Sequence, residues 1–290
     1  MFISFRSVMK YEVAMVLGII GMLCFSVTRA TTIPFYPHRG IVEVDVLLEG
    51  HIEGRFGIDT GADRLYINRD FAERNDMSLG IIGQQRKVVG IKGTSDAQSV
   101  AVHSLAIGDE RLYDLVGTAI DIPSLIEDTS AGHPDGLIGY DILRRFYVTV
   151  DFPASRLEMY SHEPTFFGSD TYSTTDFDIK RNKIIVDVII NDSIPVPMLL
   201  DYCASYSAVT PELATRIDLT AKAGQVARVS QMRVGNSLAT SNVAVTVSDL
   251  SRLYASLRGR PFEGIIGYTF LYHHKITIDY RRSRIYVHGE

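Results

Sequence analysis

The sequence of 290 residues has no tryptophan and only two cysteines. Cys24 lies in an apolar N-terminal run, so a chain cleaved after that run keeps Cys203 alone, which excludes an internal disulfide. Positive charge is not in excess either, because the formal net charge is −5, and this excludes the basic surface typical of nucleic-acid binding. Stability must therefore come from a hydrophobic core, for which 46% hydrophobic residues suffice.

The first thirty residues differ in composition from the rest of the chain. Arg6 and Lys10 precede an apolar run at residues 13–27, which is followed by the small-residue site Thr28-Arg29-Ala30. This order is typical of a secretory signal, and the run is short for a membrane span. Two interpretations stay open: a signal peptide within residues 1–30, or a membrane anchor at residues 12–28. Both predict an exported protein, periplasmic or secreted, and only the second predicts contact with a membrane.

The remaining chain contains an internal repeat. A shift of 142 residues places 44–77 on 186–219, and a shift of 128 places 136–156 on 264–284. Two ungapped blocks in the same order indicate a duplication. We therefore expect two similar lobes, residues 31–165 and 166–290, with residues 164–175 as the connector.

Hydrophobic periodicity within each lobe is that of strands, and long amphipathic helical patterns are scarce. Strands are expected at residues 41–46, 56–58, 183–190 and 198–200. Short helices are expected at residues 69–74 and 211–216, with a further one at 249–257. The fold class predicted is all-β, with two similar β-barrel-like lobes and a few short helices.

One short motif occurs once in each lobe. Asp59-Thr60-Gly61-Ala62 follows an apolar strand, and the repeat aligns it with Asp201-Tyr202-Cys203-Ala204. The tripeptide Asp-Thr-Gly is weak by itself. Its context is stronger, because an apolar pair and a glycine follow in both lobes, Leu137-Ile138-Gly139 and Ile265-Ile266-Gly267.

This combination resembles the aspartic peptidases of the pepsin and retropepsin group, and the two short lobes resemble a tandem of retropepsin-like units. The resemblance implies that Asp59 and Asp201 are the catalytic carboxylates. It also implies that the Thr60 hydroxyl ties the two loops together, while Gly61 lets backbone amides approach the carboxylates closely. The segments that end at Gly139 and Gly267 would lie beneath the two loops.

Paired carboxylates suit the hydrolysis of a peptide bond. Two carboxyl groups a hydrogen bond apart cannot both ionise, so they share one proton. The ionised group then activates a water molecule, and the protonated group assists the carbonyl oxygen and the leaving nitrogen. The expected partner is a peptide or protein substrate, and no cofactor, metal or nucleic acid is expected.

The second motif departs from the family pattern at two positions. Tyr202 stands where threonine or serine is expected, and its hydroxyl is too far from the backbone to make the same bond. Cys203 stands where glycine is expected and adds a side chain in a crowded place. A catalytic cysteine needs a histidine within reach, and no local sequence signature supplies one, so an inert thiol is the favoured interpretation of Cys203. Ala62, like its counterpart Ala204, follows the family pattern.

A hairpin that covers the cleft is a further feature of this family. The best candidate is residues 88–94, with Gly90, Ile91 and Gly93 near its tip, and an ordinary surface hairpin is the alternative. The matching stretch of the second lobe, residues 228–236, has a turn signal only at its end.

Three functions are therefore kept open. The first is a monomeric aspartic endopeptidase with an Asp59 and Asp201 dyad. The second is a homodimer in which two copies of Asp59 pair across a two-fold axis. The third is a non-catalytic descendant that binds peptides in the old cleft.

Overall fold

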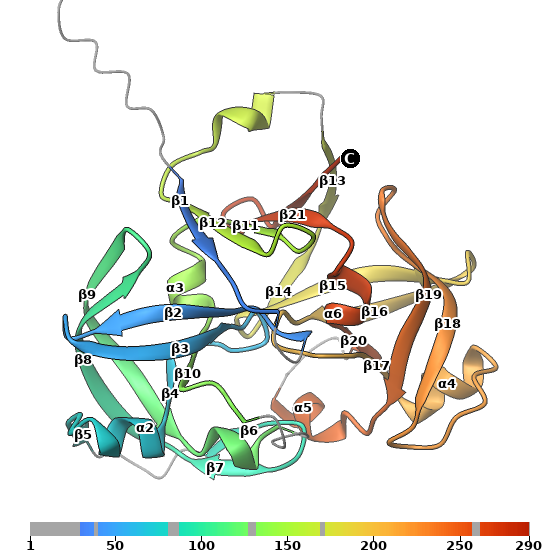
Figure 1. The fold of residues 1–290 in the computed structure, drawn as a ribbon. Coiled ribbons are helices and arrows are strands. Elements are labelled where there is room, and N and C mark those ends of the chain that lie inside the picture. The colour runs from blue at the N-terminus through green and yellow to red at the C-terminus, as the bar shows by residue number, and fades with distance from the viewer. Residues whose placement is uncertain are drawn as a thin grey trace, which may run out of the picture.

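The computed structural model describes residues 30–37, 40–80, 87–126, 132–168, 172–256 and 262–289. Figure 1 shows two lobes side by side beneath a shared sheet. The described residues are mostly strand, and their helices are short. The all-β prediction with two similar barrel-like lobes is therefore confirmed, and the position of the boundary at 165/166 stays a prediction.

The first lobe is a closed barrel of six strands. Its closure comes from pairing of the first strand with the last, β2 with β8, and β5 (Leu79–Gly80) extends the sheet beyond β8. In spatial order the barrel strands are β2 (Glu43–Leu48), β3 (Ile52–Ile58), β10 (Gly136–Ile138), β4 (Tyr66–Asn68), β9 (Glu110–Ile120) and β8 (Gln98–Ile107).

The second lobe repeats this barrel strand for strand. Closure comes from β15 with β18, and β14 (Asp178–Lys180) pairs on the outer side of β15. In spatial order its strands are β15 (Lys183–Ile190), β16 (Ile194–Leu200), β20 (Gly264–Ile266), β17 (Ser207–Val209), β19 (Leu238–Val247) and β18 (Val226–Val234).

A six-stranded antiparallel sheet joins the lobes (Figure 1). At its centre β11 pairs with β21, and the buried hydroxyls of Thr149 and Thr277 lie 2.6 Å apart. These two threonines match under the shift of 128, so they mark the pseudo-two-fold axis. In order the sheet contains β1 (Thr31–Pro34), β12 (Arg156–Tyr160), β11 (Tyr147–Asp151), β21 (Lys275–Asp279), β22 (Arg284–His288) and β13 (Tyr172–Asp176).

Short helices close the ends of the barrels. Those expected from the sequence are α2 (Arg69–Arg74), α4 (Pro211–Arg216) and α5 (Ser251–Ser256). The helix α4 begins as its sequence suggests, since Thr210 caps it by accepting a hydrogen bond from the Leu213 amide at 3.2 Å and a proline follows. The sequence did not predict α3 (Tyr140–Leu143), α6 (Tyr268–Leu271) or the 3₁₀ turns η2 (Ile122–Ser124) and η3 (Thr165–Gly168).

Two sequence boundaries need correction. The strand expected at 41–46 runs from Glu43 to Leu48. The connector expected at 164–175 is shorter, because η3 occupies its start and β13 begins at Tyr172, where it pairs with β22. No helix of the described part of the chain is long and apolar enough to cross a bilayer. The proposed signal or anchor within residues 1–30 lies outside the described residues, apart from Ala30.

Candidate active site

The structure brings the two aspartate loops together between the lobes, where β3 and β16 end (Figure 1). Both loops are held from below in the same way. The Asp59 amide donates to the Ile138 carbonyl at 3.0 Å, and the Asp201 amide donates to the Ile266 carbonyl at 3.0 Å. These bonds continue the parallel pairing of β3 with β10 and of β16 with β20.

Glycine is required where each supporting segment passes beneath its loop. A Cβ at Gly139 would lie 2.4 Å from the Arg64 carbonyl oxygen, and one at Gly267 would lie 2.5 Å from the Ala204 carbonyl oxygen. Both distances are too short for any side chain, so the close approach explains both residues. It also explains why the apolar-apolar-glycine pattern recurs in the two lobes.

The two carboxyl groups converge on Gly61. The Gly61 amide donates to Asp59 Oδ1 at 2.7 Å, and the Cys203 amide donates to Asp201 Oδ1 at 2.8 Å. A Cβ at Gly61 would lie 2.7 Å from Asp201 Oδ2 and 3.1 Å from Asp59 Oδ1. The Asp59 and Asp201 carboxyls therefore lie on either side of the same small space. A side chain at residue 61 would therefore force the pair apart.

Burial changes the ionisation of this pair. Burial, followed by the charge of Asp201, raises the pKa of Asp59 to about 8. Burial also raises the pKa of Asp201, against the opposing effects of the Cys203 amide, the charge of Lys183 and the Asp59 side chain. Asp59 is only 8% exposed, whereas Asp201 keeps more exposed surface. The arrangement favours one shared proton near neutral pH.

Thr60 ties the two loops together. Its buried hydroxyl donates to the Leu200 carbonyl at 2.7 Å and accepts from the Tyr202 amide at 3.1 Å. Both partners flank Asp201 in the chain. The first lobe thus fixes the backbone of the second lobe on each side of its aspartate.

The reciprocal bond comes from Cys203. Its thiol lies 3.5 Å from the Ile58 carbonyl oxygen, and the repeat aligns Ile58 with Leu200. In the first lobe the side-chain donor is Thr60, which aligns with Tyr202. In the second lobe the donor is the next residue, Cys203. A thiol is a weaker donor than a hydroxyl. The second loop keeps a tie to the first lobe, although the threonine is missing.

Tyr202 takes a different part in the structure. Its ring is 1% exposed and packs edge-on against Phe152, with ring centres 5.6 Å apart. Its hydroxyl is buried without a hydrogen-bond partner among the described residues. The Tyr202 side chain thus fills the core beneath the site, while its backbone amide donates to Thr60 and its carbonyl accepts from the Val42 amide at 3.3 Å.

The sequence matches a family model described as "Aspartyl protease" over residues 42–142 and 186–270, together more than half of the chain. The chain belongs to the aspartyl protease family. Each matched segment contains one aspartate loop and the glycine segment beneath it, which agrees with the duplication. The comparison with curated proteins found no match.

The segment expected to cover the cleft forms a hairpin. Its strands are β6 (Lys87–Val89) and β7 (Thr94–Asp96), and the Gly90 amide donates to the Gly93 carbonyl at 2.9 Å across the turn. Both glycines face η2 and the residue after it. A Cβ at Gly90 would lie 2.6 Å from Leu125 Cβ, and one at Gly93 would lie 2.8 Å from the Ser124 carbonyl oxygen.

The hairpin contacts both walls beside the aspartate loops. Val88 packs on a first-lobe cluster that contains Ala62, and Ile91 packs on a second-lobe cluster that Ala204 also contacts. The hairpin therefore contacts both lobes, and its part as a cover for the cleft stays a prediction. The guanidinium of Arg252, on α5, donates to the Lys92 carbonyl at 2.6 Å and adds a polar contact to the second lobe.

Lys183 is a site residue that the sequence analysis missed. It begins β15 in the second lobe, and its ammonium donates to the Gly61 carbonyl of the first lobe. The sequence contains one indication of its role, because the shift of 142 aligns Lys183 with the apolar residue Ile41. A lysine in place of an apolar residue near the start of a duplicated motif marks a difference between the lobes.

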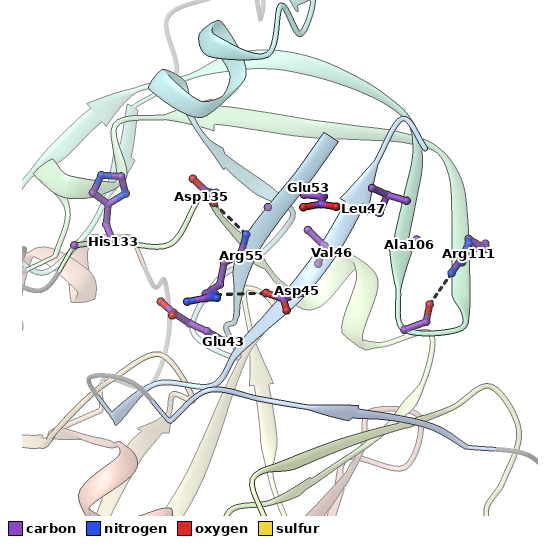
Figure 2. A pocket seen from close by; sticks show the side chains of 13 residues that line it. Glu43, Asp45, Val46, Leu47, Glu53, Arg55, Ala106, Arg111, His133 and Asp135 are labelled. Carbon is purple, nitrogen blue, oxygen red and sulfur yellow. Dashed lines mark hydrogen bonds and ion pairs between the residues drawn. The ribbon is translucent and has the colours of Figure 1, made fainter. Parts of the chain in front are cut away.

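A groove of about 950 Å³ lies elsewhere, on the outer side of the first lobe (Figure 2). Arg55 joins two of its carboxylates, since Arg55 Nε lies 3.4 Å from Asp45 Oδ1 and the Arg55 amide donates to Asp135 Oδ2 at 3.1 Å. Neither Asp59 nor Asp201 lines this groove. It is not a candidate active site.

Proposed function

We propose that the protein is an aspartic endopeptidase that hydrolyses peptide bonds with water activated by Asp59 and Asp201. The observation that carries the proposal is the convergence of two carboxyls, one from each lobe, on Gly61, where each accepts a hydrogen bond from a backbone amide. Membership of the aspartyl protease family supports peptides as the substrate class.

The reaction needs one proton shared by two carboxyl groups. The ionised carboxylate takes a proton from water as the water oxygen attacks the peptide carbonyl carbon. The protonated carboxyl hydrogen-bonds to the developing oxyanion. A proton then passes to the amide nitrogen and the carbon–nitrogen bond breaks, which releases a carboxylic acid and an amine. The raised pKa of Asp59 supports its part as the proton-carrying member.

The substitutions in the second loop leave Asp201 with a backbone donor and leave the loop tied to the first lobe. The Cys203 amide still donates to Asp201, and its thiol replaces the missing hydroxyl donor. These contacts favour the catalytic proposal over a purely peptide-binding descendant. The position of Asp201 against Asp59 favours a dyad within one chain over pairing of two Asp59 copies.

Asparagine substitutions test the proposal. Asp59→Asn and Asp201→Asn each remove one ionisable carboxyl with little change in volume, and we expect either variant to lower kcat/KM on an unstructured protein substrate by at least about a hundredfold. Wild-type cleavage should be blocked by a pepstatin-type inhibitor. Asp187→Asn is the matched control, because this exposed aspartate lies on β15 away from the loops.

Three outcomes separate the candidates. Full turnover in both asparagine variants contradicts an aspartic mechanism. Loss of activity in Asp59→Asn alone, with rates that depend on protein concentration, favours the homodimer. Peptide binding without cleavage from acidic to neutral pH favours the non-catalytic descendant.

A further inference from the structure

A lysine lies beside the carboxyl pair in only one of the two lobes. Lys183 is half-buried, and its ammonium donates to the carbonyl of Gly61, the residue on which both carboxyls converge. The aligned residue of the first lobe, Ile41, is buried and apolar. The second lobe therefore places a cation at this position where the first lobe has none.

The other charged and titratable groups around the pair come from several elements. Asp63 and Arg64 lie in the loop after Asp59 and pair with each other at 3.1 Å. The Tyr66 hydroxyl, on β4, donates to Asp63. Tyr280, which follows β21, is buried and interacts electrostatically with Asp59. The Tyr202 phenol lies in the core below, and Tyr140 packs edge-on against Tyr280.

Among these groups, Lys183 acts on both members of the pair. Its charge lowers the pKa of Asp59 and of Asp201, against the larger effect of burial, which raises both. Arg64 is engaged with Asp63 instead. The loss of Lys183 would leave two buried carboxyls whose ionised form is opposed by burial and stabilised mainly by backbone amides.

We propose that Lys183 is a positioning residue that stabilises the singly ionised form of the Asp59 and Asp201 pair and so moves the working range of the enzyme toward acid pH. The inference rests on the proposed function, because only a working dyad needs this charge state. A purely structural role is the competing explanation, in which Lys183 joins the lobes through its bond to Gly61.

Three substitutions separate charge from tethering. Lys183→Gln removes the charge and keeps a donor that can reach toward Gly61, Lys183→Arg keeps both, and Lys183→Met removes both. Lys222→Met removes the same charge from an exposed loop of the second lobe and serves as the control. If the charge matters, the pH profile of Lys183→Gln should resemble that of Lys183→Met. If the tether to Gly61 matters, it should resemble that of Lys183→Arg.

The measurement is the pH profile of kcat/KM. We expect the acidic limb to move upward by about 1 pH unit in Lys183→Met and Lys183→Gln, and to stay in place in Lys183→Arg and Lys222→Met. A Lys183→Gln profile that superimposes on the wild type would overturn the proposal. So would an equal loss of activity at every pH in Lys183→Met.

A second readout keeps this test independent of turnover. Aspartate ¹³C-carboxyl NMR, assigned with Asp59→Asn and Asp201→Asn, follows the ionisation of the pair directly. The same upward shift in Lys183→Gln supports the electrostatic role even if the wild type cleaves no peptide. An unchanged carboxyl titration together with normal cleavage rejects the inference and leaves the proposed function standing.

Discussion

At the scale of single residues, Cys203 is accommodated by a glycine in the other lobe. A Cβ at Gly57 would lie 2.6 Å from Cys203 Sγ, so the thiol occupies the space that a side chain at residue 57 would need. The repeat aligns Gly57 with Leu199 and Cys203 with Gly61. The crowding expected at Cys203 is thus relieved by a compensating change on the facing strand.

This pairing predicts coupled substitutions. We expect Gly57→Ala to lower the free energy of unfolding by about 1–3 kcal/mol, because the new methyl group overlaps Cys203 Sγ in a packed region. In a Cys203→Gly background the same change should cost less, although a contact with Leu137 at 3.1 Å remains. Urea unfolding of the two single variants and the double variant measures the coupling. Strictly additive effects would show that the two sites are independent.

At the scale of elements, the hairpin of β6 and β7 is held at its tip by the second lobe. Ile91 supplies an apolar contact, and Arg252 supplies a hydrogen bond to the Lys92 carbonyl. Both contacts cross from one lobe to the other. The hairpin therefore opens only if its tip leaves α5 and the apolar wall beside it.

Arg252→Ala should loosen this tip. Loss of an exposed charge-assisted bond is expected to cost about 0.5–1.5 kcal/mol, which corresponds to amide exchange roughly 2–10-fold faster in residues 87–96. Hydrogen exchange measured by mass spectrometry reports it. Arg228→Ala is the control, since Arg228 also donates to a backbone carbonyl, that of Asn242, on strands of the second-lobe barrel. Unchanged protection of the hairpin would show that its other contacts, among them Ile91 and the bond from the Lys92 amide to the Leu125 carbonyl, hold the tip without Arg252.

The elements that could be predicted are those with a local signal. Helix α4 has a capping threonine and an N-terminal proline, and the β15 strand is a run of β-branched residues broken only by one aspartate. The four-residue helices α3 and α6 were missed because their single turn depends on the aspartate loops above them. The Tyr140 amide, for example, donates to the Ala62 carbonyl at 3.0 Å. Lys183 was missed for a similar reason, since its approach to Gly61 depends on how the two lobes meet.

At the scale of the whole molecule, the duplication explains how a buried acidic pair is held in place. The pseudo-two-fold axis passes between β11 and β21, where Thr149 and Thr277 meet, and the aspartate loops lie between the same two lobes. The sequence repeat alone predicted two similar lobes. It did not predict that the repeated strands 147–151 and 275–279 pair with each other, because nothing local in either strand specifies its partner.

Holding this pair makes the stability of the whole protein depend on pH. Asp59 keeps its proton in the folded protein up to about pH 8, whereas its ordinary pKa is 3.8. Between these values the folded state binds more protons than the unfolded state, so the contribution of Asp59 to the free energy of unfolding falls as pH rises. His274 acts in the opposite sense, because burial lowers its pKa from 6.5 to about 4. Its contribution to the free energy of unfolding therefore rises as pH rises from about 4 to 6.5.

Comparison with Asp59→Asn isolates the carboxyl pair from His274, which both proteins share. We expect the variant to gain stability relative to the wild type as pH rises from about 4.5 to 8, because asparagine carries no proton that the pH can remove. Urea midpoints measured across this range give the difference directly. Parallel curves for the two proteins would mean that Asp59 ionises at its ordinary pKa, and the shared proton on which the dyad depends would then be absent.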